Sequence, residues 1–102
     1  MVINLFNDIF IDKDSKKKWE GYNKFDLNGN TYEGDFKGGK MEGHGKLVFN
    51  SGECYDGDFK DGIMEGHGRF DFGDGNIYEG DFKDGRMEGH GRIVVSNGSI
   101  YD

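Results

Sequence analysis

The chain has 102 residues and a formal net charge of −7, and it contains nine Phe, five Tyr and one Trp together with 19 Gly and no Pro. Its length fits one domain with a modest core, and its aromatic content and ordered pattern argue against intrinsic disorder. The acidic balance disfavours general nucleic-acid binding, because an acidic surface repels phosphates.

Residues 2–11 have the sequence VINLFNDIFI. They are predicted to form either the first strand of a degenerate repeat or a short amphipathic helix whose Leu, Ile and Phe side chains act as a cap. The segment lacks a basic leader, and no apolar run approaches the length of a membrane span. Cys54 is the single cysteine and has no partner for an internal disulfide. These features favour a cytoplasmic protein, with cytoskeletal or membrane association left open.

A lysine-rich loop completes residues 1–18, the predicted N-terminal cap or degenerate strand. The candidate lipid-contact residues are Lys16, Lys17, Lys18 and Trp19. A polybasic segment can touch an anionic membrane surface at about 1 kcal/mol per charge. Acidic residues flank the cluster on both sides and cancel much of this attraction, so a solvated loop is the favoured interpretation.

Residues 19–31 resemble the second half of the units that follow, with one residue deleted near the turn. Tyr22 and Asn23 stand where those units have His and Gly. We interpret this stretch as a partial, degenerate repeat, because a terminal repeat has no neighbour on its outer side.

A period of 23 residues organises the rest of the chain, marked by Tyr32, Tyr55, Tyr78 and Tyr101. A fixed period of this size is typical of repeat architectures, in which each unit contacts mainly its neighbours. The predicted repeats are residues 32–54, 55–77 and 78–100, and residues 101–102 begin a further motif.

Each unit carries two turn signals, Asp61-Gly62 and Asp74-Gly75 in the middle one, and is therefore predicted to form two strands. Successive strand residues point to opposite sides, which separates Tyr, Gly and Phe of the first strand from its Glu, Asp and Lys. In the last unit the second strand adds to the aromatic side Met87, Gly89, Gly91, Ile93 and Val95. One side of the predicted sheet is thus aromatic and glycine-rich, and the other is charged.

The glycines on the aromatic side have two compatible interpretations. They leave bare backbone on which a Tyr or Phe ring of a neighbouring strand can lie. Alternatively, they form bulges that twist the sheet.

The order Tyr-Glu-Gly-Asp-Phe, then Gly, then Glu-Gly-His-Gly, then a turn Gly before the next Tyr, resembles the MORN (membrane occupation and recognition nexus) repeat over roughly residues 19–102. The resemblance implies an all-β fold in which β-hairpins stack into an elongated, twisted, single-layer antiparallel sheet. It also implies non-catalytic roles in scaffolding, partner binding, phospholipid association and, in some members, dimerisation. The chain departs from the pattern in its first unit.

Residues with catalytic or ligating chemistry recur in every unit. His44, His67 and His90 are expected to lie about 9–10 Å apart, two strand spacings, which is too far for them to share a zinc ion. Carboxylate pairs such as Glu33 and Asp35 also recur, whereas an active site is needed only once. The sequence therefore predicts no enzyme activity, no metal site and no cofactor. The histidine row is expected to make partner binding somewhat pH-sensitive.

A single-layer sheet has no second layer over its aromatic side, so the rings are expected to remain partly exposed as a groove. The predicted partner-binding residues are Tyr32, Phe36, Tyr55, Phe59, Tyr78 and Phe82. The leading hypothesis is a non-enzymatic scaffold or adaptor whose groove receives an amphipathic helix or strand of another protein, with homodimerisation at the open C-terminal edge. The alternative is a peripheral membrane module that associates with acidic phospholipids. A third interpretation is an accessory domain of an enzyme.

Overall fold

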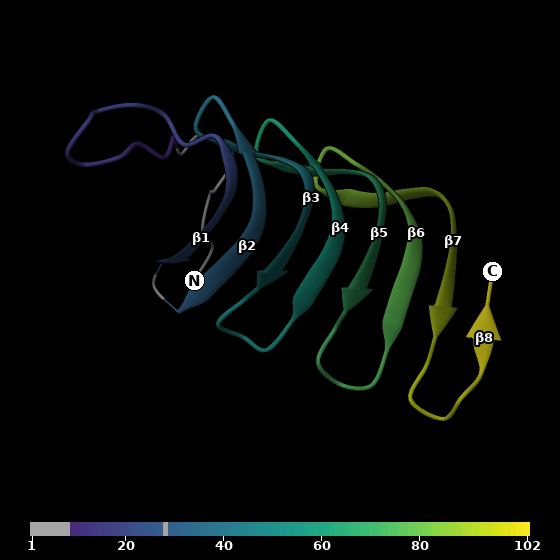
Figure 1. Cartoon of the computed structure of the whole chain (residues 1–102). Helices are drawn as coiled ribbons and strands as arrows, with labels where there is room; N and C mark the ends of the chain where they lie inside the picture. Colours follow the sequence, from purple (N-terminus) through teal and green to yellow (C-terminus); the bar gives the residue numbers. More distant parts are fainter. Residues whose placement is uncertain (1–8, 28) are drawn as a thin grey trace.

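The computed structural model describes residues 9–27 and 29–102 and shows one antiparallel sheet. The strands are β1 (Gly21–Leu27), β2 (Asn30–Lys37), β3 (Lys40–Val48), β4 (Cys54–Lys60), β5 (Ile63–Asp71), β6 (Ile77–Lys83), β7 (Arg86–Val94) and β8 (Ile100–Tyr101). Each strand pairs with the next one along the chain, and the strands follow one another along the long axis of a molecule of 50 × 25 × 20 Å (Figure 1). The predicted fold class, an elongated single layer of stacked hairpins, is confirmed.

The start of the chain is described only from residue 9, so the predicted strand or helix over residues 2–11 lies largely outside the described residues. Within the described part, Ile11 forms an isolated bridge to Lys18, and the Phe10 N–H donates to the Gly39 carbonyl at 2.7 Å. The described residues contain no helix that is long and apolar enough to cross a membrane.

The tight hairpin turns follow from the glycines and aspartates at their centres. Asp61 and Gly62 both have positive φ, 51° and 83°, and Asp84 and Gly85 repeat this with 53° and 77°. Two consecutive residues with positive φ are what a type I′ turn requires, and this turn matches the twist of the flanking strands. The first turn of each unit is therefore present as predicted. At the second, Asp74-Gly75, only Gly75 has positive φ, 96°, and a longer loop joins β5 to β6.

A bulge bends each of the three hairpins with a tight turn at the same place. Gly34 pairs with Gly45 and Phe36 with Met41, so one residue of β2 faces three residues of β3, and the β4–β5 and β6–β7 pairs repeat the irregularity. The first glycine of Gly-His-Gly lies in the bulge with positive φ, for example 66° at Gly43. A bulge of this kind kinks the strand and increases its twist.

The bulge changes the side to which its glycines point. The sequence assigned Gly89 and its equivalents to the aromatic side, and this assignment is wrong. A Cβ added at Gly66 would lie 2.9 Å from the Asp58 Oδ2, on the charged side of the sheet. The left-handed backbone turns the residue away from the face that simple alternation gives it.

The second glycine of Gly-His-Gly has the other predicted role, as a seat for a tyrosine ring. Gly45 pairs with both Gly34 and Gly57, and a Cβ added to it would overlap the Tyr32 ring. Gly68 under Tyr55 and Gly91 under Tyr78 repeat the arrangement. The prediction that rings lie on bare glycine backbone is confirmed, and bulges are present as well.

The core is a continuous row of edge-to-face rings, which we call the aromatic ladder. Tyr32 contacts Phe36 of its own strand and Phe59 of the next repeat, both with ring centroids 5.2 Å apart. Tyr55 repeats this with Phe59 at 5.1 Å and Phe82 at 4.8 Å. Such pairs contribute about 0.5–1.5 kcal/mol each beyond their buried area, so the ladder joins each repeat to the next.

The N-terminal end of the aromatic ladder is covered by rings from the degenerate unit. Phe10 stacks on Phe25 at 4.4 Å, and the Trp19 ring meets Phe36 edge-on at 5.1 Å. Phe10 and Trp19 come from the segment that the Ile11–Lys18 bridge closes. These rings replace a preceding repeat.

Candidate functional site

The six rings predicted to bind a partner lie in the hydrophobic core. The exposed fraction is 0 % for Tyr32 and Tyr55, 3 % for Phe36, 4 % for Phe59 and Phe82, and 6 % for Tyr78. The expectation that they form an exposed groove is therefore wrong. The twisted, bulged sheet brings each ring against its neighbours, so the single layer covers its own aromatic side. Partner binding through these rings stays a prediction.

The tyrosine hydroxyls are also engaged. Each donates to the carbonyl of the aspartate three residues on, at 2.9 Å for Tyr32 to Asp35, 2.7 Å for Tyr55 to Asp58 and 2.9 Å for Tyr78 to Asp81. Burial raises the pKa of Tyr32 and Tyr55 well above the usual range, and the nearby Asp carboxylates raise it further. The aromatic side of the sheet is thus buried and hydrogen-bonded, and its role is to stabilise the fold.

Glutamates of the second strands accept hydrogen bonds from the turn of the next repeat. We call these contacts the glutamate clips, and the sequence analysis missed them. The Glu42 carboxylate accepts a hydrogen bond from the Asp61 N–H at 2.9 Å, and Glu65 accepts from the Asp84 N–H at 3.2 Å. Glu20 does the same for the Gly38 N–H at 3.0 Å, although its unit is degenerate. A Glu stands at a fixed distance before the turn of the following unit, and this spacing was the available signal. The alternation of side chains along the strand placed these glutamates on the charged side, where they were interpreted as solvated.

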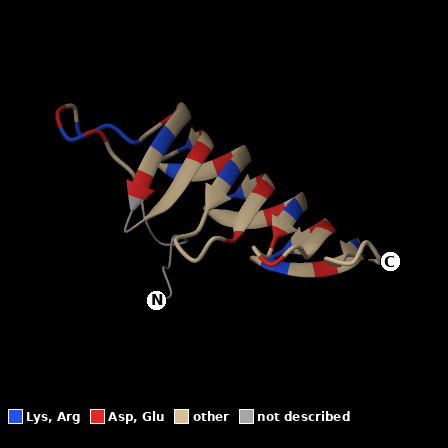
Figure 2. Ribbon diagram, turned by 90° about the horizontal axis from the view of Figure 1, so that it is seen from below, with Lys and Arg blue, Asp and Glu red and all other residues tan. Residues whose placement is uncertain are grey.

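The charged side, which we call the ionic face, carries its residues in straight rows across the strands. The first, the charge row, consists of Lys24, Glu33, Lys46, Asp56, Arg69, Glu79, Arg92 and Asp102. Register pairing places each member beside the next, and an ion pair of 3.0 Å joins Arg92 to Asp102. The sign of the charge therefore alternates along the whole sheet, which Figure 2 shows as red and blue bands on neighbouring strands.

A second row on the ionic face, the His–Asp row, runs parallel to the first and consists of Asp35, His44, Asp58, His67, Asp81 and His90. His44 faces Asp58 and His67 faces Asp81 in the register. Across the bulges, the backbone N–H of His67 donates to the Asp58 carboxylate at 3.2 Å, and His90 to Asp81 at 3.1 Å. The His44 Nε2 also lies 2.9 Å from the Asp56 Oδ1. Among the described residues, no three His, Cys, Asp or Glu side chains gather as a metal site.

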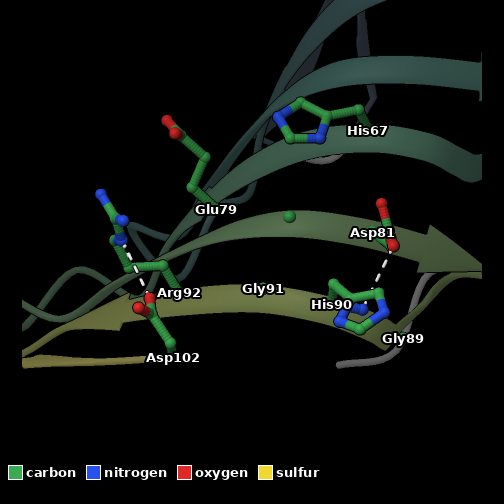
Figure 3. Close-up of a pocket in the computed structure, with 9 residues that line it drawn as sticks. His67, Glu79, Asp81, Gly89, His90, Gly91, Arg92 and Asp102 are labelled. Carbon is green, nitrogen blue, oxygen red and sulfur yellow. Dashed lines mark hydrogen bonds and ion pairs between the residues drawn. The ribbon is translucent and has the colours of Figure 1, made fainter.

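The ionic face is hollowed toward its C-terminal end. A shallow, open depression of about 680 Å³ is lined by His67, Glu79, Asp81, His90, Arg92 and Asp102, together with backbone glycines. Figure 3 shows these side chains on neighbouring strands around a surface of bare backbone, without a closed pocket. The arrangement suits contact with a broad surface better than enclosure of a small molecule.

The candidate lipid-contact residues divide between the surface and the core. Lys16, Lys17 and Lys18 are exposed in the loop that projects from the N-terminal end of the sheet (Figure 2). Trp19 is half-buried against the aromatic ladder, and its contact with lipid stays a prediction. Asp12 closes the loop by accepting the Ser15 and Asp14 N–H groups, which lowers the pKa of its carboxyl.

The C-terminal end of the sheet exposes apolar side chains that are buried elsewhere. Met87 is 46 % exposed, whereas Met41, at the same place in the first full repeat, is 1 % exposed. Ile93, Ile100 and Tyr101 are exposed beside it. Strand β8 pairs with β7 only at Ile93 and Val94, so the remainder of β7 has no partner on this side among the described strands.

The sequence profile of the MORN repeat matches residues 32–54, 55–77 and 78–100, which is more than half of the chain. The chain belongs to the MORN-repeat family. The match to this family covers each hairpin that contributes a Tyr–Phe pair to the aromatic ladder, and the family is typically non-catalytic. A search of the curated proteins found no match. MORN repeats suggest protein or membrane interaction in general, without identifying the partner.

Proposed function

We propose that this MORN-repeat protein is a non-catalytic scaffold, a stiff cytoplasmic spacer that captures an extended segment of a partner protein at its C-terminal edge. The observation that supports this is the part of β7 that has no partner among the described strands, flanked by exposed Met87 and Tyr101. A strand with a free edge and adjacent apolar side chains binds extended peptides by strand addition.

The inner repeats indicate what the captured segment looks like. Opposite β5, strand β6 places Asp81 beside His67, Gly80 beside Gly68 and Phe82 beside Gly66. The same partners opposite β7 would be an acidic residue beside His90, a small residue beside Gly91 and an aromatic residue beside Gly89. The aromatic side chain would contact Tyr78, the last tyrosine among the six predicted rings, as Phe59 contacts Tyr32.

The backbone of β7 offers a further anchor. The Met41 carbonyl accepts the Gly62 N–H at 2.9 Å, and the Met64 carbonyl accepts the Gly85 N–H at 3.0 Å. The Met87 carbonyl occupies the equivalent position, and among the described residues no N–H of a following turn reaches it. A partner segment ending in a Gly-containing turn would satisfy it.

A synthetic peptide with the sequence of residues 77–85 tests this proposal, because it carries the required acidic, small and aromatic residues. Titration into labelled protein should shift the backbone amide resonances of β7 and β8 and leave those of β2 and β3 in place. Met87→Glu should weaken binding at least about tenfold, since it places a charge in the apolar contact. Ile11→Glu is the matched control, because Ile11 is also 46 % exposed but lies at the other end. Absence of β7 shifts, or equal effects of the two variants, would refute edge capture.

A second candidate function is association with acidic phospholipids, favoured by the exposed lysines of the projecting loop. Flotation with phosphatidylinositol-phosphate vesicles tests it. Binding that disappears in Lys16→Glu with Lys18→Glu, but persists in Lys37→Glu with Lys83→Glu, would establish this function. Protein that remains in solution at physiological salt would exclude it.

A further inference from the structure

The geometry of the ionic face points to a second copy of this chain as its partner: we propose that two copies associate face to face, in antiparallel order, through the charge row and the His–Asp row. This interface is separate from the C-terminal edge. It involves the opposite side of the sheet from the aromatic ladder, whose rings are already covered.

The argument begins with the symmetry of an alternating row. The charge row begins with a cation on β1 and ends with an anion on β8, with one member on or beside each strand. Reversal of such a row exchanges every cation for an anion. A two-fold axis parallel to the strands and between β4 and β5 therefore places Lys46 opposite Glu79 of the second copy, and Asp56 opposite Arg69 of the second copy. An interface of this kind is isologous, so each contact occurs twice.

The His–Asp row obeys the same rule. The rotation that brings β4 onto β5 of the second copy places Asp58 opposite the second copy's His67, and His44 opposite its Asp81. These histidines and aspartates are all exposed. One rotation thus makes both rows complementary at the four central strands.

A third row on the same face is mixed and adds a limited apolar contact. In the register it runs through Thr31, Val48, Cys54, Asp71, Ile77 and Val94, so the rotation also places Asp71 opposite Cys54 of the second copy. The same rotation places Val48, 37 % exposed, opposite Ile77 of the second copy. Packed sheets of natural twist cross at about 30°, which concentrates contact on the central strands β3–β6.

The charge balance of the ionic face and its available area determine how strong the proposed dimer is. The charge row contains four cations and four anions and is neutral. The His–Asp row adds three aspartates per copy, which is −3 with neutral histidines, and this part of the net charge of −7 opposes association. A side of a molecule of 50 × 25 × 20 Å presents at most about 1,250 Å², against about 800 Å² that each partner of a standard interface buries. Twist reduces the usable part, and exposed ion pairs contribute only about 0.2–1 kcal/mol each. The dimer is consequently weak and sensitive to salt.

Two charge-reversed variants test the pairing between copies. Lys46→Glu with Arg69→Glu makes the centre of the charge row wholly negative, and Asp56→Lys with Glu79→Lys makes it wholly positive. In sedimentation velocity, wild type should dimerise with rising concentration, and each variant alone should lose at least about tenfold in association constant. An equimolar mixture of the two should form a heterodimer. This rescue cannot arise from pairing within one sheet, because each variant still carries its own like-charged row.

The controls separate this interface from other effects. Lys37→Glu with Lys83→Glu makes the same change in net charge beside the tight turns and should leave dimerisation unchanged, as should Met87→Glu at the C-terminal edge. If a double variant fails to fold by circular dichroism, Arg69→Glu and Asp56→Lys alone provide a milder pair with the same logic. A wild type that stays monomeric, variants that dimerise like wild type, or a mixture that remains monomeric would each overturn the proposal.

Discussion

The first and last full hairpins of this protein have nearly the same sequence but different surroundings. Met41 and Leu47 on β3 are 1 % and 3 % exposed, whereas Met87 and Ile93 on β7 are 46 % and 37 % exposed. Both strands begin at the same point of the repeat, and both contain the same bulge. The difference therefore comes from the neighbour: β3 is followed by a full-length strand and β7 by the short β8. Burial in this fold is supplied by the next repeat.

The largest expected difference concerns the repeated tyrosine. Tyr55→Ala should lower the free energy of unfolding by about 3–5 kcal/mol, because it removes a fully buried ring between two Phe rings and leaves a cavity. Tyr101→Ala should change it by less than about 0.5 kcal/mol, since Tyr101 is 61 % exposed. Urea unfolding followed by circular dichroism measures both. Similar losses would show that position in the repeat, and not the neighbour, determines stability.

The methionine pair tests the comparison at the two hairpins themselves. Met41→Ala should cost about 2–4 kcal/mol, and Met87→Ala should cost less than about 1 kcal/mol, although the local sequences match. The same unfolding experiment applies, with the slope of free energy against urea checked for equality among variants. A large loss at Met87 would mean that its side chain is covered in solution, which self-association or partner binding would explain.

The smallest expected difference concerns the glutamate clips. Glu42→Ala removes the acceptor of the Asp61 N–H and should cost about 0.5–1.5 kcal/mol. Glu88→Ala is its matched control, because no turn N–H among the described residues donates to the Glu88 carboxylate. Amide hydrogen exchange should also accelerate at Asp61 in the first variant alone. Unchanged exchange at Asp61 would refute the clip.

Most of the fold could be predicted because it depends on local rules repeated three times. The Asp-Gly turns require positive φ at both central residues, and the structure has it at Asp61 and Gly62. Alternation assigned the rings and the carboxylates to opposite sides, and the family match supports the same architecture. The bulge glycines escaped this reasoning, since left-handed backbone at Gly43, Gly66 and Gly89 breaks the alternation on which it rests.

The candidate site could be predicted less well, because exposure is a property of packing. Six rings on one side of a single layer looked uncovered, but Phe59 closes over Tyr32 and Phe82 over Tyr55 from the following repeat. Trp19 was a candidate for lipid contact, and in the structure its ring packs against Phe36. Neither arrangement could be predicted, because a side chain's neighbours across repeats cannot be read from its own segment.

The 23-residue period, the turn residues and the division into an aromatic side and an ionic side could thus be predicted from the sequence. They depend on backbone geometry over a few positions. Which surfaces remain for binding was decided in three dimensions. Bulge, twist and stacking bury Tyr55 completely, leave Met87 bare and align charges from eight strands into one alternating row. Contacts between neighbouring strands and between neighbouring repeats produce these results, and their strength depends on how the repeats fit together.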